Sequence, residues 1–276
     1  MKVLRPTGWA AGRLLLFHLT LRENRAKYKR SSLGWAWSMI NPLATMLIFT
    51  FVFRIVLKID PPVGNPSGLK NFSFFLICAL LPWNFLSNSL TGATGSIVSN
   101  AGLIKKVYFP RSVLPASNVL SWDTNFLIEL GVLSLALLIV QRVVFQFLPI
   151  ALLVVVIQTL FVLGVGLAFA SLNVYFRDVT HFLGILLLLW FYATPVIYPL
   201  SLVPDFHVIA GTRIPIKDIY NLNPMVHFTE AYRAIFYDLK VPSAQSFVFM
   251  TIGATVSLLV GYTLFKRLEP RFAEEL

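Results

Sequence analysis

Few residues of this 276-residue sequence are of a type and spacing that could do covalent chemistry. Asp123 and Glu129 are the two carboxylates inside a long apolar stretch, and their separation of six residues places them about 120° apart around a helix axis. They therefore do not form a paired acid–base site. Because a carboxylate in such a segment usually faces protein or water, we expect a hydrogen-bonded contact between helices or subunits rather than a proton relay.

Motifs for metal, nucleotide or hydrolytic chemistry are absent from the sequence. Its single cysteine, Cys78, lies in an apolar run and is expected to be a small buried side chain, and the four histidines are far apart. There is no Gly-Lys dipeptide, and hence no phosphate-binding P-loop, and there is no HExxH or GxSxG motif. We expect no metal site and no ATPase activity of the chain's own. Gly164 and Gly166 lack the third glycine of a dinucleotide motif, and close helix packing explains them better.

The elements that would carry these residues are membrane helices. Apolar residues make up 57% of the chain and charged residues 13%, against about 45–50% and about 25% in soluble domains. A membrane-spanning helix needs about 20 mostly apolar residues. Six stretches suit this length, which predicts an all-α integral membrane protein formed by one transmembrane domain over residues 1–276: Ser31–Phe53, Asn71–Ile104, Val113–Val140, Pro149–Val174, His181–Tyr198 and Phe247–Phe265.

The basic residues orient these six stretches. With both termini on one side, 15 of the 23 Lys and Arg lie on that side, which the positive-inside rule assigns to the cytoplasm. The formal net charge of +11 therefore indicates basic cytoplasmic loops and anionic lipid rather than a nucleic-acid partner.

A segment before the first span, residues 9–30, has the pattern of a helix lying on the membrane surface. Leu14, Phe17 and Leu21 recur at helical spacing, while Arg22 and Arg25 lie largely off that stripe. Such a basic amphipathic helix lies in the interface plane against anionic headgroups.

A long segment between the fifth and sixth spans, residues 200–246, is Pro-rich at first and then helical. Met225–Asp238 reads as a helix, with Asn223 as its N-cap and Pro224 in its first turn. A loop of this length with its own helix is more often functional than a simple connection.

Four motifs stand at the predicted membrane borders. They are Leu33-Gly34 with Trp37 and Asn41-Pro42; Lys105-Lys106-Val107-Tyr108-Phe109-Pro110-Arg111; Phe176-Arg177-Asp178; and Thr194-Pro195 with Tyr198-Pro199. With Leu81-Pro82-Trp83 and Leu222-Asn223-Pro224, their order resembles, over nearly the whole chain, the membrane subunit of type-2 ATP-binding-cassette exporters of cell-surface polysaccharides, the O-antigen and teichoic-acid export permeases.

That resemblance implies a homodimer of six-span subunits in the bacterial cytoplasmic (inner) membrane, with two copies of a separate ATPase bound below. This chain would bind no cofactor, because the partner uses the ATP and magnesium. The substrate would be a glycan or similar polymer on a polyprenyl-type lipid. A helix near residues 100–111 would couple to the ATPase, through Lys105, Lys106, Tyr108, Phe109, Pro110 and Arg111.

The resemblance also implies roles at the other borders. Leu33, Gly34 and Trp37 would border the place where substrate enters from the cytoplasm, and re-entrant helices within residues 200–246 would gate its exit. We expect Arg177 and Asp178 to form a local ion pair that holds an intracellular loop.

Aromatic residues, 14% of the chain, suit a glycan path for a separate chemical reason. Sugars stack their apolar faces on aromatic rings, so an aromatic path would bind a glycan weakly at many registers. The alternative is that Trp and Tyr mark the membrane interfaces and Phe packs against lipid. The candidates for the lining are Trp83, Phe85, Trp190, Phe191, Tyr192 and Tyr198.

Two other functions compete with polysaccharide export. The same fold could export a drug or another lipid. A membrane enzyme acting on lipid-linked sugars is less favoured, because such an enzyme generally needs an acidic cluster, and Asp123 and Glu129 are poorly matched in phase.

Overall fold

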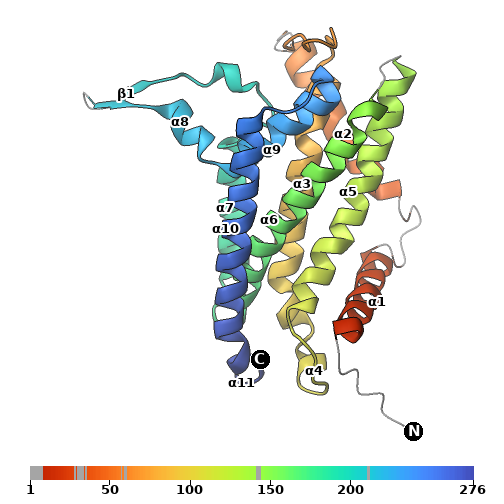
Figure 1. Ribbon diagram of the computed structural model, residues 1–276, viewed down its shortest axis with the longest axis vertical. Coiled ribbons are helices and arrows are strands. Elements are labelled where there is room, and N and C mark those ends of the chain that lie inside the picture. The colour runs from red at the N-terminus through yellow and green to blue at the C-terminus, as the bar shows by residue number, and fades with distance from the viewer. Residues whose placement is uncertain are drawn as a thin grey trace.

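The computed structural model describes residues 9–27, 29, 34, 36–56, 58, 61–140, 144–209 and 212–276. Over these residues the chain is mostly helical, as predicted, and long helices form an elongated bundle (Figure 1). The first half contains α1 (Trp9–Lys27), α2 (Ala36–Thr50) continued by η1 (Phe51–Val56), α3 (Phe72–Ser99), α4 (Ala101–Ile104) and α5 (Val113–Ile139). The second half contains η2 (Phe145–Phe147), α6 (Leu148–Tyr175), α7 (Val179–Tyr192), η3 (Leu200–Leu202), β1 (His207–Ile209), β2 (Thr212–Ile214), α8 (Ile216–Asn221), α9 (Pro224–Tyr232), η4 (Arg233–Asp238), α10 (Ala244–Leu268), η5 (Glu269–Arg271) and α11 (Phe272–Glu275).

Apolar helices occur at all six predicted positions, but they differ in length. Four are long and apolar enough to cross a membrane: Phe72–Ser99, Val113–Ile139, Phe145–Tyr175 and Ala244–Glu275. The other two, Leu43–Val56 and Val179–Tyr192, are shorter. The latter has 14 residues, or about 21 Å at 1.5 Å per residue, against a hydrocarbon core of about 30 Å.

Helix α3 is the centre of the bundle. It packs against α2, α5, α6, α7 and α9, and its side chains are buried on most sides, with Leu76, Leu86 and Leu90 fully enclosed. A helix that is apolar all round is expected to be surrounded by protein. Pro82 lies inside α3 without ending it, and the carbonyl oxygen of Pro82 accepts a hydrogen bond of 2.9 Å from Gln158 Nε2 of α6.

Helices α6 and α10 cross in close contact at Gly164 and Gly261. A Cβ atom added to Gly164 would lie 2.3 Å from the Ser257 carbonyl carbon, and one added to Gly261 would lie 1.9 Å from the Gly164 oxygen. The two backbones therefore touch where no side chain fits, which confirms that Gly164 serves close helix packing. Gly166 also faces a neighbour, since its added Cβ would lie 3.2 Å from the Cβ of Ala93.

A second, smaller core lies where α4, α11 and one end of α6 meet. It joins side chains of α1, α3, α5, α6 and the C-terminal segment, among them Leu19, Ile97, Leu114, Val174 and Phe272. In Figure 1, α4 and α11 lie together at this end, whereas β1 and α8 project from the opposite end of the bundle. The two ends are called here the α4 end and the hairpin end.

A helix, α1, occupies Trp9–Lys27 of the segment predicted to lie on the membrane surface, but its apolar stripe is divided between two environments. Leu14 and Phe17 are exposed, while Leu19, outside the predicted stripe, is buried in the small core. Thus α1 packs on protein with one side and offers apolar side chains with another.

The hairpin end confirms the predicted helix and adds a small sheet. Helix α9 starts after Asn223, whose side chain accepts a hydrogen bond from the Met225 backbone N–H, and η4 continues it to Asp238. Strands β1 and β2 pair antiparallel, with His207 opposite Ile214, so the all-α prediction missed this short hairpin. Strands of three residues are too short to show the alternating apolar pattern that identifies a strand in a sequence.

Candidate functional site

An accessible basic segment of the α4 end is the 105–111 loop, which joins α4 to α5. Ile104 anchors its start in the small core, and Pro110 and Arg111 lead into α5. Lys105, Lys106 and Val107 are exposed, and Tyr108 is completely so. The side chains at 105–108 make no hydrogen bond or ion pair with any residue in the described ranges, so their polar groups are free to meet another molecule.

The remaining residues predicted to couple to a partner are placed differently. Phe109 is partly buried and packs against the small core, whereas Pro110 is exposed. The Arg111 backbone N–H donates to Glu269 Oε1 at 3.1 Å, and its guanidinium Nη1 donates to the Glu269 carbonyl oxygen. Arg111 therefore fixes the loop rather than presenting a charge. Sequence reasoning missed Glu269, because nothing local pairs residues 158 positions apart.

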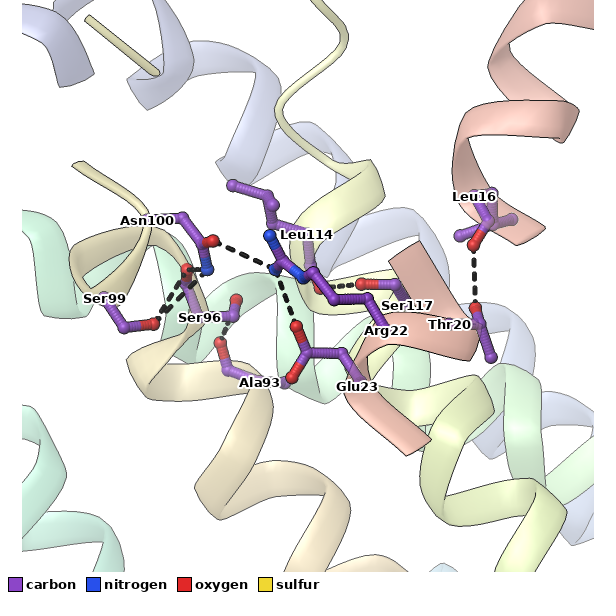
Figure 2. A network of polar contacts seen from close by, with 10 residues as sticks. All are labelled: Leu16, Thr20, Arg22, Glu23, Ala93, Ser96, Ser99, Asn100, Leu114 and Ser117. Carbon is purple, nitrogen blue, oxygen red and sulfur yellow. Dashed lines mark hydrogen bonds and ion pairs between the residues drawn. The ribbon is translucent and has the colours of Figure 1, made fainter. Parts of the chain in front are cut away.

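Helix α1 is tied to the start of α4 and to α5. Figure 2 shows Arg22 reaching from α1 to Asn100, whose Oδ1 accepts from Nη2 at 3.0 Å, and the same nitrogen contacts Glu23 Oε1 at 2.7 Å. The Ser121 hydroxyl of α5 donates to Asn24 Oδ1 at 2.7 Å. A displacement of α1 would therefore also shift Asn100, the residue that precedes α4.

Lys27 is an unusual cation in this contact. Its ammonium group lies 3.6 Å from the centroid of the Trp122 ring of α5 and is buried without a hydrogen-bond partner in the described chain. Burial lowers the pKa of Lys27 to about 7, and the nearby Glu23 and Glu129 carboxylates only partly oppose this shift. A cation held over an aromatic face in this way is a specific contact between α1 and α5.

The predicted substrate-entrance residues are only partly described. Leu33 lies outside the described residues. Gly34 has a φ of +51°, the left-handed conformation that favours glycine, which agrees with a sharp turn before α2. Trp37, in the first turn of α2, is exposed.

The turn between α6 and α7 does not contain the predicted ion pair. Within the described part of the chain, Arg177 makes no ion pair with Asp178. Its Nη2 instead contacts the Glu275 carbonyl oxygen at 3.4 Å, so the C-terminal segment competes for this guanidinium. The turn is held by Thr180, whose hydroxyl donates to Asn173 Oδ1 at 2.9 Å.

The two carboxylates of α5 are separate, as expected. Asp123 Oδ1 accepts a hydrogen bond of 2.9 Å from the Thr159 hydroxyl, a contact between α5 and α6. Glu129 lines an apolar cavity of about 310 Å³ between α2, α3 and α5, beside Met46, Phe74 and Leu133. No group of three potential metal-ligating acidic, His or Cys residues occurs within the described ranges.

The aromatic candidates fall into a buried set and an accessible set. Phe85 is stacked on Phe126 with ring centroids 5.0 Å apart, and Trp83 lies edge-to-face 5.4 Å from Phe191; both Phe85 and Trp83 are buried inside the single chain. Trp190, Phe191 and Tyr198 are half-buried, and Tyr192 is exposed. A path along this subunit's surface can therefore meet Tyr192 but not Phe85.

Asn223 joins the end of α7 to the start of α9. Its Oδ1 accepts from Trp190 Nε1 at 2.9 Å and from the Met225 backbone, while its Nδ2 donates to Ala193 O and Thr194 Oγ1 at 3.1 and 3.0 Å. All the donors and acceptors of this amide are thus used. The sequence identified the cap but not the link to Trp190.

Two basic residues of the hairpin end, Arg233 and Lys217, are held by contacts within the chain. Arg233 is buried: its guanidinium contacts Glu230 Oε1 and the Val196 carbonyl oxygen, each at 2.8 Å, and lies 3.9 Å from the Phe75 ring centroid. Lys217 pairs with Asp205 at 2.9 Å. The Arg233 contacts fasten η4 to α3 and to the segment after α7.

Known proteins resemble this chain over almost its whole length. The family described as ABC-2 type transporter matches residues 15–237. The chain is 35% identical to the O-antigen export system permease protein RfbA of Myxococcus xanthus, over 95% of each chain. It is 30% identical to a protein of the same name from Klebsiella pneumoniae, over 94% of each. It is 24% identical to the polysialic acid transport protein KpsM of Escherichia coli, over 95% of this chain and 96% of that one.

Proposed function

The chain belongs to the ABC-2 type transporter family, and from this premise we propose how it works as the membrane subunit of a polysaccharide exporter. It is a permease subunit, and the ATP that drives export is hydrolysed by a separate nucleotide-binding subunit. Relatives named for O-antigen export and polysialic acid transport support a cell-surface polysaccharide as the cargo. This favours polysaccharide over the drug or lipid cargo that the fold alone would allow.

The observation that carries the ATPase contact is the 105–111 loop. Two lysines and a completely exposed tyrosine lie on a loop that starts after the buried Ile104 and ends at Arg111, which is bonded to Glu269. A soluble partner with an acidic, apolar-lined socket would bind such a surface. We assign the α4 end to the cytoplasm, in agreement with the positive-inside rule, so that both termini are cytoplasmic.

The substrate path is proposed to run between two copies of this chain. Because α3 is enclosed by its own neighbours, a single subunit supplies a packed bundle, and a homodimer would supply the passage. We assign the lining to Tyr192, with Trp190, Phe191 and Tyr198 beside it, and give Trp83 and Phe85 a supporting role beneath them. A polyprenyl-linked glycan would slide along such rings without a single tight site.

The hairpin end is proposed to gate the exit. Helices α9 and η4 would be re-entrant, entering and leaving the membrane on the outer side, and the short helices α2 and α7 would complete six spans where the bilayer is locally thinned. Support comes from the burial of α9 among α3, α6 and α10 rather than in solvent.

The ATPase contact is tested by co-purification. The wild-type chain is co-expressed with a nucleotide-binding subunit from the same genome. Tyr108→Ala and Lys106→Glu variants are compared with Tyr262→Ala, which changes an exposed tyrosine on α10. We expect the two loop variants to recover much less ATPase subunit and Tyr262→Ala to recover the wild-type amount. Equal recovery by all four proteins would contradict the assignment.

A further inference from the structure

The C-terminal segment contacts the 105–111 loop through Glu269. We propose that residues 269–276, here called the C-terminal strap, hold the 105–111 loop in the orientation that meets the ATPase, and that Glu269 is the positioning residue of this contact. The inference rests on the proposed function of that loop. Figure 1 shows the strap, η5 and α11, at the same end of the bundle as α4.

The loop and the strap are joined by two hydrogen bonds between Arg111 and Glu269. Glu269 accepts the Arg111 backbone N–H on its carboxylate and the Arg111 guanidinium on its own carbonyl oxygen. Its second carboxylate oxygen is held 2.8 Å from Lys266 Nζ, one turn earlier in α10. The carboxylate therefore bridges the last turn of α10 and the end of the loop, and hydrogen bonds to a charged group are among the stronger ones.

The strap is itself packed into the small core through Phe272. Phe272 is completely buried, edge-to-face with Phe265 at 5.3 Å and with Tyr175 at 6.3 Å between ring centroids. The Tyr175 hydroxyl donates to the Leu268 carbonyl oxygen at 3.0 Å. These contacts tie the strap to α6.

The side chains of the loop itself contribute little to holding it. Those of residues 105–108 are exposed and make no hydrogen bond to any other described residue, and the first end of the loop is fixed by the buried Ile104 and by backbone hydrogen bonds to α4. Its second end depends on Arg111 and on the half-buried Phe109. Without the Glu269 contact, the second end of the loop would keep only its continuation into α5 and the packing of Phe109.

The functional test uses the reconstituted complex of permease and ATPase, with ATP hydrolysis and polymer export measured together. Glu269→Ala should leave the complex assembled and hydrolysis close to wild type while export falls about 10-fold, the loss expected for a charge-assisted hydrogen bond. Glu269→Gln keeps an oxygen that accepts the Arg111 N–H and should restore part of the export. Glu274→Ala, an exposed carboxylate in the same strap, is the matched control. Export by Glu269→Ala equal to that of the control would overturn the proposal.

A second measurement needs neither ATPase nor polymer. A spin label on Tyr108→Cys reports loop mobility, because the native Cys78 is buried and does not react. The label should become more mobile when Glu269→Ala is added. If the Glu269→Ala protein does not accumulate, Arg111→Lys replaces it, because this variant removes the guanidinium contact but keeps the charge. The label should become more mobile in Arg111→Lys as well. An unchanged spectrum in both would refute the strap. If wild type fails to bind an ATPase while the label responds, the proposed function fails and the strap stands.

Discussion

At the residue scale, the structure gives polar and glycine residues of the bundle specific contacts rather than catalytic tasks. Asp123 meets Thr159, Asn24 meets Ser121 and Gln158 meets the Pro82 carbonyl. Each contact joins two helices, and polar side chains commonly link helices within membranes. Gly164 and Gly261 do the same by having no side chain.

The glycine crossing predicts a large effect from one added methyl group. Gly261→Ala would place a Cβ 1.9 Å from the Gly164 oxygen and must force α6 and α10 apart. We expect a loss of about 1–3 kcal/mol in the free energy of unfolding, as for overpacked cores, measured by thermal unfolding in detergent. Gly184→Ala in α7, where an added Cβ meets nothing within 4 Å, should instead leave stability equal or higher. Equal melting of the two variants would show that the crossing is looser than described.

Lys27 predicts a pH dependence with a definite sign. Its pKa falls from 10.5 to about 7 on folding, so between these values the unfolded state binds more protons than the folded state. Stability should therefore rise as pH increases from about 7 towards 10.5, and this contribution should be absent at lower pH. Unfolding of the purified chain at pH 7 and pH 9 measures it.

The control for this prediction is Lys29, which is exposed and only two residues away. Lys27→Met should remove the rise in stability between pH 7 and pH 9, whereas Lys29→Met should retain it. A rise that survives in Lys27→Met would mean that another group is titrating.

At the element scale, helix α9 of the hairpin end and its continuation η4 are held by hydrogen bonds at both ends. Asn223 ties the start of α9 to α7, and at the far end the Tyr237 hydroxyl donates to the Pro62 and Leu69 carbonyl oxygens at 2.7 and 3.0 Å. Ser67 adds a hydrogen bond of 2.6 Å to the Tyr237 carbonyl oxygen. An element held in this way moves as a unit, and releasing either end requires breaking several hydrogen bonds.

This arrangement predicts that Asn223→Ala loosens α9. The variant loses a helix cap, which costs about 1 kcal/mol, as well as the links to Trp190 and Thr194. Amide hydrogen exchange over residues 224–232 should become faster than in wild type. Asn221→Ala, whose side chain makes no hydrogen bond within the described residues, provides the comparison. Equal exchange in the two variants would show that α9 does not depend on Asn223.

At the scale of the whole molecule, composition and spacing predicted the helical membrane class, the positions of six apolar helices, of which four are long enough to cross a membrane, and the capped helix α9. These features follow from local rules: apolar length, Pro and Asn at helix starts, and basic loops. The contacts that shape the two ends could not be predicted from these local rules, because they join residues far apart in sequence. Examples are Arg111 with Glu269 and Arg22 with Asn100. The predicted Arg177–Asp178 pair shows the same limit, since adjacency in sequence did not bring the charges together.

Whether an aromatic side chain is buried could not be predicted from the sequence, because burial depends on where its helix lies in the bundle. Phe85 and Tyr192 have the same standing in the sequence as candidates for the path, yet one is stacked inside the chain and the other is exposed. The difference comes from α3 lying at the centre of the bundle and α7 at its edge. Only accessible rings can contact a moving polymer.

The most direct test of this account is ATP-dependent movement of the polysaccharide in inverted membrane vesicles that contain this chain and its ATPase subunit. The lipid-linked polymer starts on the outer, cytoplasmic face, where an added glycosidase digests it. With ATP we predict that the polymer becomes protected inside the vesicles, and that protection is lost when either subunit is omitted. A polymer that stays accessible with both subunits and ATP, or that becomes protected without the ATPase, would contradict the account.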